Sequence, residues 1–318
     1  MIEVLRKGML TTVQDGGRHG YQHRGVPVCG AMDAHSLALA NILAGNGQGE
    51  AALEITGTGC ALIFHTPCAF AICGGRFDMT LDGNAIEMGR AYSAHKGATL
   101  DIGAAKSGFR GYVAFSGGLG VPLFLESRST CLTGGFGGYM GRALENGDKI
   151  PLRGPIHWLR NMENRLAPLR EMPQSAEARV VLGPQQGHFS AEGVEAFFTG
   201  SYIITADSNR MGYRTSGPKI GFAPGKGGNI ISDGVAMGAV QVPGGLPIIM
   251  MADRQTIGGY AKIAHVISAD LPVVAQLKPG DSIGFKAVGV EEAQELCRQR
   301  ARALSALAYQ LDSGWNAL

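Results

Sequence analysis

The chain has 318 residues and a formal net charge of +2, and 49 of its residues are glycine, about twice the usual share of roughly 7%. Its length predicts about two domains, and the scattered glycines exclude both a collagen repeat and a single glycine-rich linker. There is no run of five or six like charges and no apolar stretch of about 18 residues, so we expect neither nucleic acid nor a membrane among its partners.

The cysteine pattern and the N-terminal residues bear on the cellular compartment in which we expect the protein. The six cysteines form no CxxC pair, and the first residues lack the apolar core of a signal peptide. We therefore expect reduced thiols, a cytoplasmic protein and no metal site.

Short apolar runs between turn residues predict a mainly β protein with few short helices. In chain order the predicted strands cover 61–64, 69–73, 112–115, 180–182, 203–204, 247–251 and 273–275. Asp82-Gly83-Asn84 predicts a hairpin turn between strands over 77–81 and 85–88, because Asp-Gly readily takes the positive φ of such turns.

Three segments have features of helices. The first runs over 33–44 with Asp33 as its N-cap, and a shorter one follows Ser190. The last covers 291–318 and begins with Glu291 and Glu292, where the helix dipole favours negative charge. We expect this C-terminal helix to pack on the outside of the second domain.

We expect an N-terminal domain over 1–165, a linker over 166–179, a C-terminal domain over 180–290 and the terminal helix. The charged segment 160–179, which contains Pro168 and Pro173, motivates the linker. A weak internal sequence repeat supports two similar halves. Residues 145–152 and residues 278–285 each predict a Gly-Asp turn followed by a strand of alternating polar and apolar residues.

A first group of polar residues lies in the N-terminal half. Gln14, Asp15 and Arg18 precede or flank a glycine turn; they either close that turn as an Asp–Arg pair or line a pocket in which Arg18 binds a carboxylate. Asp33 is either a plain N-cap or part of the same site. Glu54 lies in a predicted strand and points either outward or into a cleft.

A second group of polar residues lies in the C-terminal half. Asn209 and Arg210 lie close to two further hydrogen-bond donors, Tyr213 and Arg214, in either a solvated loop or a binding loop. The strand over 247–251 is followed by Asp253-Arg254-Gln255-Thr256. Buried polar groups must be paired, so these residues either bond each other or await a ligand.

Tyr260 and Lys262 follow two residues apart, which predicts that they face the same side of a strand. Such a pair suits a base or an oxyanion-stabilising role. The sequence has no phosphate-binding P-loop, no GxSxG nucleophile turn and no HExxH zinc motif.

Together these motifs carry a family resemblance. The series comprises Thr11–Arg18, Gly30–Asp33, Leu43–Asn46, Ala52–Glu54, Ser208–Arg214, Gln241–Pro243 and Asp253–Tyr260. Over about residues 1 to 290 the chain resembles the family of bacterial 5-oxoprolinase C subunits. The family is also called biotin-dependent carboxyltransferase-like, KipA-like or allophanate hydrolase subunit 2-like. The resemblance implies two cyclophilin-like β-barrel domains.

The resemblance also implies an activity. With a KipI-like B component and a LamB/YcsF-like A component, the chain would open 5-oxoproline to glutamate with ATP, used at the level of the complex. Carboxyl transfer from carboxybiotin to urea is an alternative, with biotin carried by another protein because no Met-Lys-Met occurs here. A non-enzymatic alternative is a KipA-like antagonist that binds a KipI-like kinase inhibitor.

From side-chain chemistry we expect a pocket at the interface with the KipI-like component. Arg210 and Arg254 would bind a carboxylate or phosphorylated intermediate, and Asp253 and Lys262 would act as acid and base. The remaining residues would bind or orient the amide: Asn209, Gln241, Gln255, Thr256 and Tyr260. Two positions depart from the family pattern, with Ile257 in place of Thr and Ala261 in place of Pro.

Overall fold

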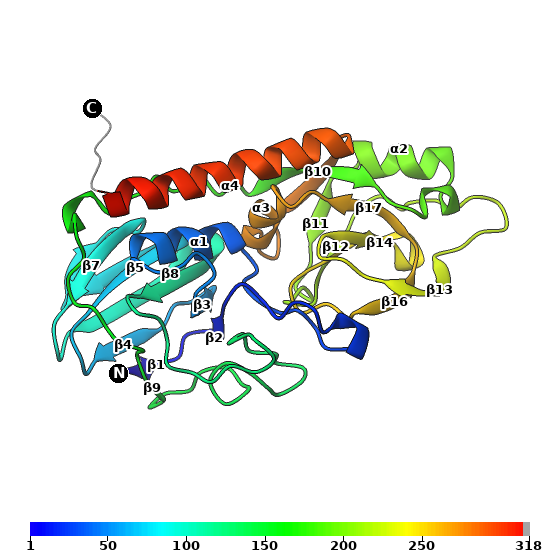
Figure 1. Ribbon diagram of the computed structural model, residues 1–318. Helices are drawn as coiled ribbons and strands as arrows, with labels where there is room; N and C mark the ends of the chain where they lie inside the picture. The colour runs from blue at the N-terminus through cyan, green and yellow to red at the C-terminus, as the bar shows by residue number, and fades with distance from the viewer. Residues whose placement is uncertain (314–318) are drawn as a thin grey trace. The chain divides into compact units, whose positions relative to one another are not determined.

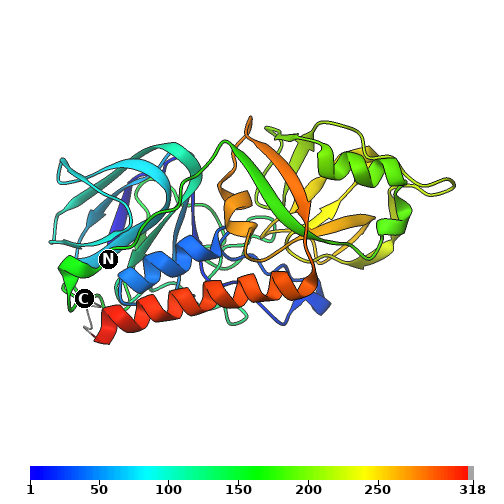
Figure 2. The ribbon, with the colours of Figure 1, turned by 90° about the horizontal axis from the view of Figure 1, so that it is seen from above.

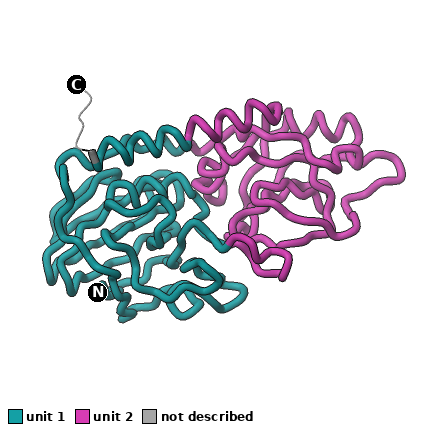
Figure 3. Tube along the Cα trace, in the orientation of Figure 1, with its two compact units in different colours: residues 1–18, 29–172, 301–318 teal, residues 19–28, 173–300 magenta. Residues whose placement is uncertain are grey.

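The computed structural model describes residues 1–313, which form two compact units (Figure 3). The first comprises Met1–Arg18, Cys29–Met172 and residues 301–313, and the second comprises His19–Val28 and Pro173–Arg300. The mainly β prediction is confirmed: the first unit has a nine-stranded sheet and the second a closed barrel of seven strands. The predicted domain ranges stay predictions, because compactness does not show which segments fold independently.

The first unit is built on one antiparallel sheet (Figure 1). Its path runs β2-β3-β8-β4-β1-β9, and β5 pairs with β6, β7 and β8. The strands are β1 (Ile2–Arg6), β2 (Leu10–Gln14), β3 (Ala52–Thr56), β4 (Ala61–Phe64), β5 (Cys68–Leu81), β6 (Asn84–Ile86), β7 (Arg90–Ala94), β8 (Thr99–Phe115) and β9 (Lys149–Ile150). The predicted hairpin is confirmed, because Leu81 pairs with Asn84 across Asp82 and Gly83, which both have positive φ.

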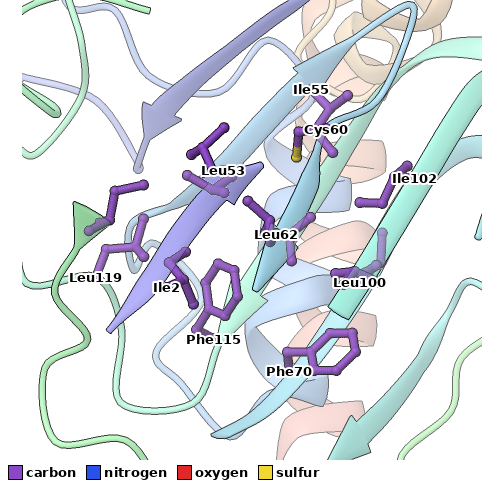
Figure 4. Close-up of a cluster of buried hydrophobic side chains, with 14 of the residues drawn as sticks. Ile2, Leu53, Ile55, Cys60, Leu62, Phe70, Leu100, Ile102, Phe115 and Leu119 are labelled. Atoms are coloured by element: carbon purple, nitrogen blue, oxygen red, sulfur yellow. The ribbon is translucent and has the colours of Figure 1, made fainter. Parts of the chain in front are cut away.

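Alternation along the strands divides the apolar side chains between two clusters. On β3, Leu53 and Ile55 enter a core of aliphatic and aromatic residues, whereas Ala52 enters a second cluster beside α1 (Ala34–Leu43). Figure 4 shows the first cluster, in which Leu62, Phe70 and Phe115 lie together. The period of two along a strand explains the division, because neighbouring side chains leave opposite faces.

α1 lies against β5 and β8 of this sheet (Figure 2). The Asp33 side chain accepts a hydrogen bond from the Ser36 N–H at 2.9 Å, so the predicted N-cap is confirmed. Every residue from Ser36 to Leu43 is buried. The helix is therefore a core element of the first unit.

The terminal helix α4 covers Val290–Ser313. Leu304 and Leu311 join the cluster around α1. The expected packing on the second domain is therefore wrong for this part of the helix, because these leucines bury their apolar surface in the first unit. Residues 314–318 of the predicted helix lie outside the described residues. Within residues 1–313, no helix is long and apolar enough to cross a membrane.

The second unit is a closed barrel in which parallel pairing of β10 with β18 completes the order β10-β17-β14-β15-β12-β11-β18. Its strands are β10 (Ser175–Leu182), β11 (Tyr202–Ile204), β12 (Gly212–Ser216), β14 (Ala239–Gln241), β15 (Ile248–Met250), β17 (Lys262–Val266) and β18 (Ser282–Ala287). The helix α2 (Ala191–Thr199) is capped by Ser190 as predicted, and its Phe197 stacks on Phe285 of β18 at 4.4 Å between ring centroids.

One predicted strand is wrong, because 273–275 belongs to the helix α3 (Leu271–Gln276). The β-branched pair Val273-Val274 favours a strand, but Pro272 stands in the first helical turn, where its missing N–H costs nothing. Short 3₁₀ turns complete the fold: η1 (Gln22–Arg24), η2 (Met162–Asn164), η3 (Gln186–His188) and η4 (Pro243–Gly245).

The predicted linker has structure at both ends. Ala167 is buried in the first unit, where its N–H donates to the carbonyl of Gly89 at 2.8 Å, and at the far end of the linker Arg179 pairs with Asp270 at 2.7 Å. Before that end, β10 begins at Ser175. The charged composition of the segment thus reflects local ion pairs as well as solvent exposure.

The two similar sequence segments, 145–152 and 278–285, have the same hydrogen-bond pattern in the structure. Asp148 accepts from the N–H of Glu145, and Asp281 accepts from the N–H of Lys278. The N–H of Val4 donates to the carbonyl of Asp148, and that of Ile204 to the carbonyl of Asp281. Each turn is followed by a strand, β9 or β18. This correspondence supports the duplication that the sequence predicts.

A separate two-stranded ribbon belongs to the second unit. It pairs β13 (Asn229–Gly234) with β16 (Ile257–Tyr260). Ile231 is 94% exposed and Ile257 62% exposed. The ribbon therefore presents apolar side chains to solvent beside the candidate site.

Candidate functional site

A small cavity of about 140 Å³ in the second unit gathers four of the predicted substrate residues. Its polar lining consists of Asn209, Arg214, Gln241, Gln255 and Tyr260. Its apolar lining consists of Met211, Gly212, Ile248 and Met250. Because a water molecule takes up roughly 30 Å³ in the liquid, the cavity has the space of about five water molecules and suits one small organic molecule.

Gln241 carries a buried amide nitrogen without a hydrogen-bond partner. The residue is only 2% exposed, and its Nε2 bonds no residue of the part of the chain that the structure describes. Leaving such a group unsatisfied costs about 1–3 kcal/mol. A buried donor at the wall of a cavity is the feature expected where a ligand carbonyl completes the hydrogen bond.

Gly258 allows two amides to approach one another at this cavity. A Cβ atom built on Gly258 would lie 2.8 Å from Nε2 of Gln241 and 3.2 Å from Nε2 of Gln255. Any larger residue would therefore press on both groups. This is the close backbone approach for which glycine is retained in a strand.

Arg214 is a cavity residue that the predicted substrate-binding set lacked. Its backbone N–H is held by Ser208 Oγ at 3.0 Å, and Asn209 Oδ1 accepts from the N–H of Met211 at 2.8 Å. The exposed Arg214 side chain forms no ion pair with any residue in 1–313. Alternation in β12 identifies it, because the neighbouring Tyr213 points into the barrel and donates to the carbonyl of Ala275.

Arg210 and Asp253 neutralise each other, which favours a structural role over the ligand-binding and acid–base roles predicted for them. Nε and Nη2 of Arg210 donate to the two carboxylate oxygens of Asp253 at 2.9 and 2.8 Å, and the side chains are 4% and 3% exposed. A buried charge needs such a partner. The pair joins the loop after β15 to the loop before β12, and we assign it a structural role.

Arg254 likewise forms a hydrogen bond within the protein. Its Nε donates to the carbonyl of Val235 at 2.9 Å, and its side chain is buried. The residue thus connects the loop after β15 to the chain after β13. Its predicted role as a carboxylate ligand has no support in this geometry.

Lys262 lines a different and larger cavity, of about 500 Å³. Its side chain is 2% exposed, and Nζ bonds Oδ2 of Asp233 at 3.2 Å. Thr256, His265 and His23 lie in the same wall. Hydrogen bonds from the Gly234 N–H and from Lys262 hold the pKa of Asp233 below its ordinary value. Burial, and then the charge of Lys262, lower the pKa of His265.

The prediction that Tyr260 and Lys262 face the same side of one strand is wrong. Tyr260 ends β16 and lines the small cavity, whereas Lys262 begins β17 and lines the large one. The strand is interrupted at Ala261, whose N–H donates to the carbonyl of Gly228. Lys262 is instead the register partner of Gln241 across β14 and β17, so the two cavities adjoin.

The two departures from the family pattern lie in different surroundings. Ile257 lines the large cavity and is mostly exposed, and Ala261 is fully buried. A buried alanine keeps its N–H available for the bond to Gly228, which a proline could not make.

Asp33 and Glu54, from the first group of polar residues, share a buried network in the first unit. Glu54 Oε2 accepts from the Met32 N–H and from the Tyr112 hydroxyl, both at 2.8 Å, and the Tyr112 oxygen accepts from the Asp33 N–H. Burial and the two carboxylates hold the pKa of Tyr112 well above its ordinary value. These bonds join α1 to the sheet and favour the structural alternative for both residues.

Asp15, Arg18 and Gln14 hold the loop that follows β8. Asp15 accepts from the Gly17 N–H and the Ser127 hydroxyl, each at 2.8 Å. Arg18 does not pair with it; its Nη2 donates to the carbonyl of Ser129. Gln14 Nε2 donates to Thr12 Oγ1 and to the Thr130 carbonyl. The predicted Asp–Arg pair is therefore wrong, since each residue satisfies the loop separately.

Further observations concern metals and thiols. Among residues 1–313, no group of three or more His, Cys, Asp or Glu side chains could hold a metal ion. Burial raises the pKa of Cys60 to about 12 and that of Cys68 to about 11. These thiols therefore stay protonated near neutrality.

Comparison with known proteins gives three findings. Residues 24–287 match the family model described as "Carboxyltransferase domain, subdomain A and B". The chain is 36% identical over 312 residues to the C subunit of 5-oxoprolinase from Escherichia coli (strain K12), covering 98% of this chain and 99% of that protein. It is also 36% identical to urea amidolyase of Saccharomyces cerevisiae, but there it covers only 18% of the relative's length.

A solved structure agrees over nearly the whole chain. The crystal structure of Kluyveromyces lactis urea carboxylase superposes with a TM-score of 0.89 at 33% identity. The match covers 96% of this chain and 29% of that one. The fold therefore occurs both as a separate chain and as a segment of larger proteins.

Proposed function

The chain belongs to the carboxyltransferase domain, subdomain A and B, family, and on this basis we propose that it is the C subunit of a 5-oxoprolinase. Such a complex opens the cyclic amide of 5-oxoproline to give glutamate and uses ATP. The match to a separate bacterial protein over almost the full length of both chains supports this function. We propose that the partners are a KipI-like B component and a LamB/YcsF-like A component, and that the complex works in the cytoplasm.

The observation that carries the proposal is the unpartnered Nε2 of Gln241 in a cavity of small-molecule size. A cyclic amide offers a carbonyl oxygen as acceptor. A hydrogen bond from Gln241 to that oxygen would satisfy the buried donor and orient the ring. Gln255 lies beside Gln241 across Gly258 and supplies a second amide for the same group.

The donors at the carbonyl also have a chemical consequence. Negative charge develops on the carbonyl oxygen when an amide is attacked or activated, and preorganised donors stabilise that charge more than they stabilise the ground state. Gln241 is held in place by β14 and by its own burial. It therefore needs little reorganisation when the charge appears.

Arg214 would bind the carboxylate of 5-oxoproline. It lines the same cavity as Gln241, and a guanidinium presents a fork that matches a carboxylate. Asn209 and Tyr260 complete the polar lining and would orient the ring. Lys262, in the adjoining cavity, keeps its predicted place at the reacting group, whereas Arg210, Asp253 and Arg254 support the loops around the site.

ATP does not fit the residues that line these two cavities. A triphosphate needs several donors around its phosphates, but among residues 1–313 the wall of the larger cavity has Lys262 as its one lysine or arginine, and Arg214 lies in a cavity of only about 140 Å³. We therefore assign the nucleotide to another component of the complex.

The urea alternative has one observation in its favour, namely the close structural match to a urea carboxylase. Urea has a carbonyl that Gln241 could bind but no carboxylate for Arg214. An Arg214→Gln variant therefore separates the two functions: it should weaken the use of 5-oxoproline and leave a urea reaction largely unaffected.

The proposed function is tested by reconstitution with the KipI-like and LamB/YcsF-like components and measurement of ATP-dependent glutamate release. We expect the wild-type chain to restore the activity and a Gln241→Leu chain to restore little of it. A Gln14→Leu chain is the matched control, because Gln14 is equally buried but lies in the first unit. Equal activity of the wild-type and Gln241→Leu complexes would contradict the assigned site.

A further inference from the structure

The ion pair between Lys262 and Asp233 is asymmetric. Lys262 is 2% exposed, whereas Asp233 is 57% exposed. The ammonium group is therefore fixed by the barrel, and its partner is a carboxylate that reaches in from the surface. A buried ammonium needs an anion beside it, but the geometry does not require that this anion be Asp233.

Asp233 can leave when another anion takes its place beside Lys262. It lies on β13, where Ser232, Asp233 and Gly234 are all exposed and the pairing with β16 is irregular between Asn229 and Asp233. The Asp233 carboxylate is already largely hydrated, so the main cost of its departure is that Lys262 loses its anion, and an incoming oxyanion removes that cost. A competing oxyanion could therefore replace this carboxylate without unfolding the barrel.

The cavity beside Lys262 has the space and the donors for such an oxyanion. Its volume is about 500 Å³, and Thr256, His23 and Gln22 contribute polar groups to its wall. Lys262 acts as a point charge there, which suits a phosphoryl or carboxyl group.

The position of Lys262 relates this cavity to the amide site. Gln241 and Lys262 are partners in the register of β14 and β17, next to a register shift between Val240 and Gln241, so the backbones of the two residues lie side by side. Gln241 would hold the amide carbonyl, so a group beside Lys262 lies next to the amide that is to be activated.

We infer that Lys262 forms an oxyanion site and that Asp233 is an internal carboxylate which occupies the site until a phosphoryl or carboxyl group displaces it. The inference rests on the proposed function for the identity of the amide. It extends that function by assigning to this chain the place where the activating group is received. Phosphoryl and carboxyl groups share the oxyanion chemistry, and their sources are separated by the probes below.

The test is an NMR titration of the histidines of the full-length chain with inorganic phosphate and, separately, bicarbonate, using chloride at matched ionic strength as the control. His265 lines the cavity, and the charge of Lys262 contributes to lowering its pKa. An anion bound at Lys262 should shift the His265 resonances and raise its pKa. A shift with phosphate alone indicates a phosphoryl group, and a shift with bicarbonate alone indicates a carboxyl group.

Two variants make the test specific. Lys262→Met should abolish the His265 response, and Asp233→Asn should tighten anion binding several-fold by removing the competing carboxylate. Lys226→Met and Asp207→Asn, at exposed positions of the same unit, are the matched controls and should change nothing. No response to either anion in both the wild-type chain and Asp233→Asn overturns the inference. A response that survives in Lys262→Met identifies an adventitious ion only and also overturns it.

Failure of this inference is distinguishable from failure of the proposed function. If Gln241→Leu abolishes glutamate release but no anion reaches Lys262, the oxyanion site is wrong and the amide site stands. If anions bind at Lys262 but the reconstituted complex does not open 5-oxoproline, the oxyanion site stands and the proposed substrate is wrong.

Discussion

Replacement of Gln241 by leucine should separate stability from activity. Leucine has a similar size to glutamine but carries no polar atom, so Gln241→Leu removes a buried donor that has no partner among the residues described by the structure. Because an unsatisfied buried group costs about 1–3 kcal/mol, we expect the free energy of unfolding to stay level or to rise by about 1 kcal/mol. Most substitutions at buried positions have the opposite effect.

The same substitution should reduce catalysis. If Gln241 donates to an oxygen that gains negative charge, losing the bond raises the activation barrier by about 1.5–3 kcal/mol, or roughly 10- to 150-fold in kcat/KM. The assays are urea-induced unfolding of the chain and ATP-dependent glutamate release by the reconstituted complex.

Gln14→Leu provides the contrasting control. Gln14 Nε2 has two partners, Thr12 Oγ1 and the carbonyl of Thr130, whereas its Oε1 has none within residues 1–313. Losing the two bonds outweighs removing the unpartnered oxygen, so Gln14→Leu should destabilise the chain by about 1 kcal/mol without changing kcat/KM. The account would be refuted if Gln241→Leu destabilised the chain as strongly as Gln14→Leu while leaving the kinetics unchanged.

Further outcomes follow from the same geometry. Gly258→Ala should lower activity at least tenfold, because the added Cβ would press on the side-chain amides of Gln241 and Gln255. The unfolding midpoint in urea should stay nearly unchanged, because Gly258 does not have a positive φ. Full activity of Gly258→Ala would contradict the claim that these two amides bind the substrate. Asp253→Ala should destabilise the chain by about 3–5 kcal/mol, because it leaves the buried Arg210 charge unpaired, whereas a loss of turnover without loss of stability would restore an acid–base role. For His265, the pKa in the folded state lies below the ordinary 6.5, so between these two values the unfolded state binds more protons than the folded state. The contribution of His265 to stability is therefore present above pH 6.5 and is lost as the pH falls through the folded pKa. His265→Gln should flatten this part of the pH dependence of the free energy of unfolding, measured in urea. Asp33→Ala should cost about 0.5–2 kcal/mol by removing the N-cap with no effect on kcat/KM, and a large kinetic effect would return Asp33 to the active site.

The local elements could be predicted where one residue type has a single strong preference. The Asp82-Gly83 hairpin and the caps at Asp33 and Ser190 are confirmed because a short polar side chain or a glycine satisfies a defined backbone geometry. The strand predicted over 273–275 failed because two valines outweighed the signal of the preceding Pro272.

The site was harder to predict, because it depends on pairing between distant segments. Arg210 and Asp253 are 43 positions apart, and no local pattern shows that they neutralise each other. The interruption at Ala261 separates Tyr260 from Lys262, and strand alternation alone could not reveal it. Arg214 could have been found, since alternation from the buried Tyr213 already places it on the other face of β12.

The resemblance to a known family supplied what local reasoning could not. It implied the β-barrel architecture and the class of reaction, and the family assignment is confirmed over residues 24–287. It could not tell which polar residues meet a ligand, because charged residues that support the loops and residues that line the cavity stand side by side in the same motifs.

The central claim is that Gln241 donates a hydrogen bond to the carbonyl of the cyclic amide. The most direct measurement follows the ¹⁵N-labelled side-chain amide of Gln241, assigned by its absence in Gln241→Leu, in the chain alone and in the assembled complex. We predict that 5-oxoproline shifts its proton resonance downfield and that proline, which lacks the ring carbonyl, does not. An unchanged Gln241 amide signal in a complex that is turning over 5-oxoproline would contradict the claim.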